Sequence, residues 1–68
     1  MKSYIVNTQP LSTGEHEVHA YDCERLPKRE HQKPLGFHTS SIEAVEEAKK
    51  YFSNVDECLF CSDDYHTS

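Results

Sequence analysis

The three cysteines of this 68-residue chain, together with one histidine, form two closely spaced pairs. His19 and Cys23 are separated by three residues, and Cys58 and Cys61 by two. Imidazole nitrogen and thiolate sulfur are ligands that Zn²⁺ prefers, and four of them complete its tetrahedral coordination. Because each pair can approach one ion without straining the chain between its members, the spacing predicts a zinc site formed by His19, Cys23, Cys58 and Cys61.

Two other histidines compete with His19 for its place among the ligands. His16 lies three residues upstream, an odd number, so its side chain should point to the opposite face of an extended strand. His66 lies five residues beyond Cys61 and reaches the ion if the end of the chain folds back. We prefer His19 because it adjoins Cys23 at the end of a predicted strand. The remaining histidines are expected to be ordinary exposed or half-buried residues: His31 and His38.

A zinc ion with four protein ligands has no open coordination position, which favours a structural role over hydrolysis. A glycine-rich phosphate loop and a nucleophile elbow are both missing, since the only glycines are Gly14 and Gly36. We therefore expect no enzyme activity and no catalytic residues. Two rival interpretations stay open. In one, Cys23 or Cys58 is a zinc-activated thiolate that accepts an alkyl group; in the other, Cys58 and Cys61 form a metal-free redox pair.

The chain has the size at which a hydrophobic core alone contributes little net stability. Only 35% of its residues are hydrophobic, and none is tryptophan. Domains this small usually need a disulfide, a metal or a partner chain. Any closed set of disulfides would leave one of the 3 cysteines over. The composition therefore favours a metal.

We expect no secretory leader, because no cationic start followed by an apolar run opens the sequence, and no apolar stretch approaches the roughly 20 residues needed to cross a bilayer. We expect a cytosolic protein, because paired cysteines in that reducing compartment bind metal more often than they form disulfides. The formal net charge of −5, from 12 acidic and 7 basic residues, disfavours binding to nucleic acid. An unidentified protein partner is the remaining expectation, with the chain itself a monomer or a weak homodimer.

Apolar and turn-forming residues predict an α+β fold, in which a β-hairpin or three-stranded antiparallel sheet packs with one α-helix. Strands are expected over three segments: residues 2–7, 15–21 and 35–38. Residues 24–34 carry six charged side chains and two prolines, which predicts a surface loop. Residues 55–61 are expected to form a knuckle that presents the Cys-x-x-Cys pair to the metal.

The helix is expected over about residues 40–52, beginning with a capping box formed by Ser40 and Glu43. Its apolar stripe is expected to face the core and consists of Ile42, Val45, Ala48 and Phe52, with Tyr51 beside it. The rest of the expected core is Tyr4, Ile5, Val6, Val18, Leu26, Leu35, Phe37 and Leu59. Residues 1–61 would form a single domain, followed by a flexible polar tail over residues 62–68.

The order of these elements and motifs resembles the Ada-type metal-binding domain over about residues 4–61. The matching motifs are His-x-x-x-Cys at residues 19–23, Ser-Ile-Glu-Ala at residues 41–44 and Cys-x-x-Cys at residues 58–61. In that family two cysteine pairs hold one zinc ion, and a zinc-bound thiolate takes a methyl group from methylated DNA phosphates. The resemblance therefore implies a zinc-binding fold and, as an alternative function, alkyl acceptance. A histidine in place of the first cysteine makes the site less negative, which lowers the nucleophilicity of its thiolates. The chain is more similar still to small bacterial proteins of this zinc-binding shape.

Overall fold

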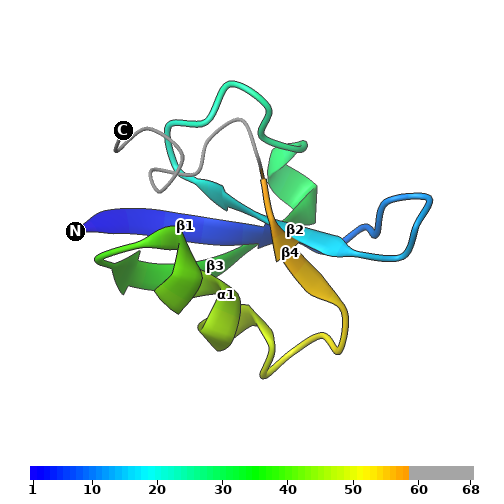
Figure 1. Ribbon diagram of the computed structural model, residues 1–68. Helices are drawn as coiled ribbons and strands as arrows, with labels where there is room; N and C mark the ends of the chain where they lie inside the picture. The colour runs from blue at the N-terminus through cyan, green and yellow to red at the C-terminus, as the bar shows by residue number, and fades with distance from the viewer. Residues whose placement is uncertain (59–68) are drawn as a thin grey trace.

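The structure is a computed structural model, and it describes residues 1–58 as a four-stranded mixed sheet with one α-helix (Figure 1). The predicted α+β class is confirmed. The strands lie in the order β3-β1-β2-β4, and their bounds are β1 Lys2–Asn7, β2 His16–Ala20, β3 Gln32–His38 and β4 Val55–Glu57. The helix α1 spans Ser41–Ala48, and a short 3₁₀ turn, η1, spans Arg29–His31. The predictions for Leu59, Cys61, His66 and the tail lie outside the described residues.

The antiparallel part of the sheet follows the prediction closely. Strand β1 pairs with β2 as the expected hairpin, with Ile5 opposite His19, and it pairs with β3 on its other side. Strand β3 begins at Gln32, three residues before the predicted start, so the end of the predicted loop is strand. Pro34 is tolerated there because β3 lies at the edge of the sheet.

The prediction of a three-stranded antiparallel sheet is wrong, because β4 adds a fourth strand parallel to β2. Val55 pairs with His16 and Glu57 with Val18, and the amide of Cys58 donates to the carbonyl of Val18 at 2.9 Å. The segment predicted as a knuckle therefore begins as a strand. Pattern recognition missed it because three residues with a single apolar side chain carry almost no strand signal.

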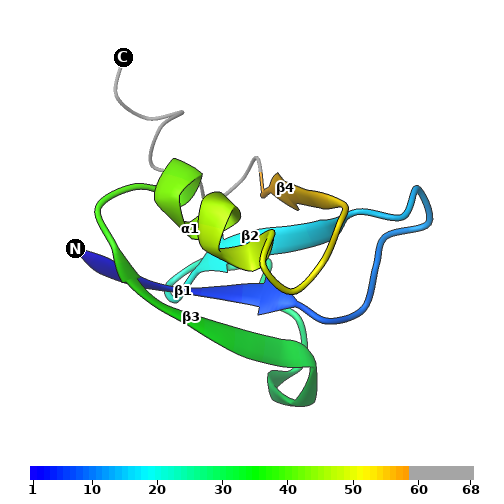
Figure 2. The ribbon, with the colours of Figure 1, turned by 90° about the horizontal axis from the view of Figure 1, so that it is seen from below.

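The connections of the sheet decide which of its faces each segment covers. Strands β2, β3 and β4 all run parallel to one another, so both the 21–31 segment and the connection containing α1 must cross the sheet. They do so in opposite directions, and since such crossovers are right-handed, they lie on opposite faces. Figure 2 shows α1 against one face. Strand β2 is thus covered on both sides, and Val18, His19 and Ala20 are all buried.

The core beneath α1 is built partly from residues other than those predicted. The buried helix residues are Ser41, Ala44 and Ala48, small side chains that let the helix approach the sheet closely. The predicted stripe is rotated by about one position, so that Ile42 is 60% exposed, whereas Val45 and Phe52 pack against the core as expected. The prediction is also wrong for two other residues expected in the core, because Phe37 and Tyr51 are exposed. The buried cluster consists of Tyr4, Val6, Val18, Ala20, Leu35, Ala44 and Ala48.

The helix is shorter than the predicted 40–52. It ends at Ala48, after which the amides of Lys50 and Tyr51 bond to carbonyls three residues back, in turn geometry. Its start has the predicted Ser40 cap, whose hydroxyl accepts from the amide of Glu43. The Glu43 carboxylate reaches back one residue further than a capping box requires, and accepts from the amide of Thr39 at 3.0 Å. This hydrogen bond is the main reason that the pKa of Glu43 lies below its ordinary value.

The Glu43 contact generates a pH-dependent prediction. A pKa lowered in the folded state means that the unfolded chain binds more protons, so the carboxylate contributes stability above the ordinary pKa of glutamate (about 4.3) and loses it as the pH falls through the folded value. We expect Glu43→Gln to lower the free energy of unfolding at pH 7, with the difference shrinking as the pH falls below the ordinary pKa of glutamate and through the lowered pKa of Glu43 in the folded state. Denaturant unfolding across this range measures it, with Glu46→Gln on the exposed helix surface as control. Equal stability of the wild type and Glu43→Gln at pH 7 would contradict the role of this contact.

Candidate metal centre

The sheet brings three of the four predicted ligand residues together from three separate segments. His19 is on β2 and, alternating with Val18 and Ala20 of the helix-side core, points to the face away from α1. Since Val18 pairs with Glu57, Cys58 follows directly beside His19. Cys23 closes a turn in which its amide donates to the carbonyl of Ala20 at 3.1 Å. Cys61, the fourth predicted ligand, lies outside the described residues.

The three side chains have the spacing that a single zinc ion requires. Their ligand atoms all lie within 4.8 Å of one another, and the sulfurs of Cys23 and Cys58 are 4.0 Å apart. Two sulfurs at about 2.3 Å from a tetrahedral ion lie roughly 3.8 Å from each other. Both cysteines are reduced, and His19, Cys23 and Cys58 are only 2%, 7% and 2% exposed. The residues present therefore fit three of the four positions of a buried tetrahedral site.

The surroundings of His19 favour its metal-binding form. Burial lowers the pKa of His19, which keeps the imidazole neutral and able to donate a lone pair. The amide of Arg25 donates to the sulfur of Cys23 at 3.4 Å. A carboxylate oxygen of Glu17 lies 3.7 Å from Nε2 of His19. Burial, followed by the charges of Asp56 and Glu15, raises the pKa of Glu17.

The structure places the other described histidines away from the cysteines. His16 is on the helix side of β2. Its ring stacks on the ring of Phe52, with 3.9 Å between the ring centroids, and its Nδ1 lies 2.9 Å from the carbonyl oxygen of Asn7. His38 has Nε2 2.7 Å from the carbonyl of Leu35. Within residues 1–58, no further set of three histidine, cysteine or acidic side chains has metal-binding spacing. His66, the other histidine weighed against His19, lies outside the described residues.

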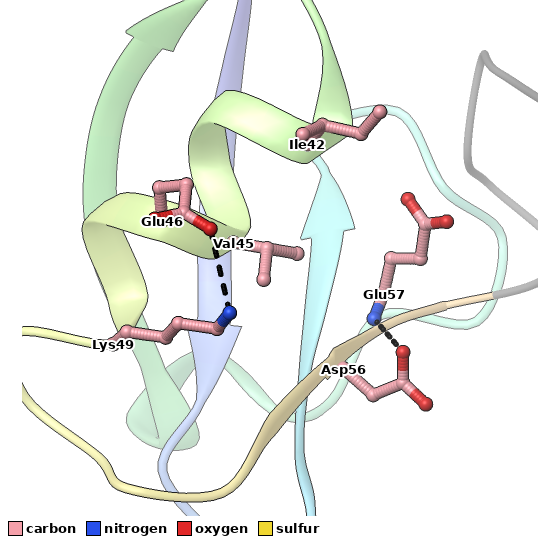
Figure 3. Close-up of a pocket in the computed structure, with 6 residues that line it drawn as sticks. All are labelled: Ile42, Val45, Glu46, Lys49, Asp56 and Glu57. Carbon is pink, nitrogen blue, oxygen red and sulfur yellow. Dashed lines mark hydrogen bonds and ion pairs between the residues drawn. The ribbon is translucent and has the colours of Figure 1, made fainter.

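A hollow of about 220 Å³ lies between α1 and β4 (Figure 3). It is lined by Ile42, Val45, Glu46, Lys49, Asp56 and Glu57. The charged side chains that line it interact with other groups of the protein. Lys49 forms an ion pair with Glu46 at 3.3 Å, and the carboxylate of Asp56 accepts a hydrogen bond from the amide of Glu57 at 2.8 Å. The Glu57 carboxylate accepts from the hydroxyl of Ser41 at 2.6 Å. This hollow therefore has few groups that converge on a ligand, and the metal centre is the stronger candidate site.

Comparison with protein-family models, with curated proteins and with solved structures finds no match for this chain. The resemblance to the Ada-type domain thus stays a prediction. Any functional proposal must therefore be argued from the side chains of this chain. Sequence reasoning identified His19, Cys23 and Cys58 but gave no role to Glu17. The sequence did contain one indication. Glu17 lies two residues from His19, and residues two apart on a strand share a face.

The positions of the two competing histidines generate a prediction about metal ligation. In protein loaded with Co²⁺, we expect His19→Cys to keep the metal and to strengthen the sulfur-to-cobalt charge-transfer absorption, because one more thiolate is bound. His16→Cys places its thiol on the opposite face and should leave that absorption unchanged. Ultraviolet–visible titration measures both variants. A stronger band from His16→Cys with none from His19→Cys would contradict the assigned geometry.

Proposed function

We propose that this chain is a structural zinc-binding domain that acts through its surface, as an interaction or regulatory module, without chemistry of its own. One Zn²⁺ would be held by His19, Cys23, Cys58 and Cys61. The observation that carries the proposal is the buried group of one imidazole and two thiols within 4.8 Å, drawn from three segments of the chain.

The energies involved favour a structural role for the metal. A structural zinc site contributes about 10–16 kcal/mol of apparent binding free energy near neutral pH. The core of a domain this small rarely supplies more than about 3–5 kcal/mol. A site that joins β2, the start of the 21–31 segment and the end of β4 would therefore dominate the stability of the fold.

A metal-free redox protein is the second candidate. Cys61, the predicted redox partner of Cys58, lies outside the described residues, but the sulfurs of Cys23 and Cys58 lie only 4.0 Å apart. A disulfide between them would need the sulfurs to approach to about 2.05 Å. The alkyl-acceptor alternative is weaker, since an electrophile must reach a sulfur and both thiols are buried. The metal and redox candidates differ in whether the reduced protein needs an ion to fold.

A reducing compartment belongs to the proposal, because thiols must stay reduced to bind metal. The charge of −5 favours a protein partner over nucleic acid. The chain itself would be a monomer or a weak homodimer. No described feature identifies the partner, so the test is directed at the metal.

Removal of the metal is the first test of the proposal. We expect a strong chelator to abolish most of the far-ultraviolet circular dichroism of the purified protein, because zinc binding and folding share one free energy. Added Zn²⁺ should restore the spectrum, whereas Mg²⁺, which prefers oxygen ligands, should not. A folded spectrum that survives chelation would favour the redox candidate and contradict the structural role.

Substitution of one ligand provides an independent test. Cys58→Ser should lower the melting temperature by more than 10 °C and remove its dependence on added zinc, because only two of the described ligands remain. Ser53→Ala, at an exposed position, should retain both properties. Thermal unfolding with and without zinc compares them. If zinc stabilises Cys58→Ser as much as the wild type, Cys58 is not a ligand.

A further inference from the structure

Glu17 is not one of the predicted ligands, but its carboxylate lies near the candidate metal centre, beside His19. It lies two residues before His19 on β2, so both side chains point to the face away from α1. Its Oε1 atom is 3.7 Å from Nε2 of His19, and its side chain is 27% exposed. The carboxylate is therefore more exposed to solvent than the imidazole, which is itself 2% exposed.

The position of Glu17 distinguishes it from a ligand. Carboxylates count among the groups that can hold a metal, yet the close set within residues 1–58 contains only His19, Cys23 and Cys58. Glu17 thus reaches the histidine without joining the group around the ion. A carboxylate beside a metal-bound histidine commonly holds the ring nitrogen that does not bind the metal.

We propose that Glu17 is a positioning residue of the metal centre, whose carboxylate accepts the Nε2–H of His19 and directs Nδ1 to the metal. The inference rests on the proposed zinc-binding function. The present separation of 3.7 Å is longer than a hydrogen bond, and an adjustment of less than 1 Å by the partly exposed Glu17 side chain closes it.

The arrangement has two consequences for the site. It fixes one tautomer of His19, with the proton on Nε2, before the metal arrives. It also fixes the plane of the ring, so that less rotational freedom is lost on binding. Outer partners of this kind typically change metal affinity by about 10–100-fold.

The test compares Glu17→Gln and Glu17→Ala with Glu15→Ala in full-length protein. Glu15 is the matched control because it is acidic, partly buried and close to the start of the same strand, but four residues from His19. Zinc affinity is measured by competition with a chromophoric chelator. We expect affinity about 10–100-fold below wild type for Glu17→Ala, an intermediate loss for Glu17→Gln, whose amide oxygen still accepts a hydrogen bond, and less than a threefold change for Glu15→Ala.

A second readout separates positioning from a general effect on the fold. Nitrogen-15 NMR of the His19 ring in zinc-loaded wild type should show the proton on Nε2 and the metal on Nδ1. Metal on Nε2, or a Glu17→Ala affinity equal to wild type, would overturn the role of Glu17 while leaving the zinc site standing. A wild-type protein that binds no zinc would overturn the proposed function and this inference together.

Discussion

The coverage of β2 on both faces is the constraint on which the other features of this structure depend. Two crossovers run over the sheet in opposite directions, and their common handedness places α1 on one face and the 21–31 segment on the other. A strand buried on both sides normally carries apolar residues at every position. Strand β2 instead carries His19 at 2% exposure, flanked by the buried Val18 and Ala20. An imidazole in that place needs a polar partner, and the sheet brings two thiols to it.

The same topology explains how so short a chain can bring together candidate ligands that lie far apart in its sequence. Strand β4 has only three residues, yet its parallel pairing with β2 sets Cys58 beside His19, and the turn after β2 returns Cys23 to the same place. The helix-side core depends on small residues, with Ala44 and Ala48 completely buried. Such a core removes little apolar surface from water. The two faces of the sheet thus have different roles: one is closed by modest hydrophobic packing, the other by a group suited to a metal.

The sequence allowed some of this architecture to be predicted, and the failures have physical causes. The hairpin and the helix start were predicted because β-branched runs and the Ser40 cap are local signals. The rotation of α1 was missed because the large side chain of Ile42 outweighed the small Ala44 in the apolar pattern, although close packing favoured the smaller residue. Strand β4 was missed because its pairing is non-local. Among the candidate site residues, His19 and not His16 lies beside Cys23 and Cys58, as strand alternation predicts. Glu17 was overlooked because a carboxylate one alternation away from a ligand has no motif of its own.

X-ray absorption at the zinc K-edge, on protein purified without added metal or chelator, tests the central claim most directly. The buried centre predicts about one zinc per chain, with sulfur neighbours at about 2.3 Å and at least one imidazole nitrogen at about 2.0–2.1 Å. That result would place the metal among the side chains that the sheet brings together. Protein without a zinc edge, or with zinc surrounded only by oxygen and nitrogen, would contradict the metal centre, and the cysteines would then be read as a thiol pair or as part of the core.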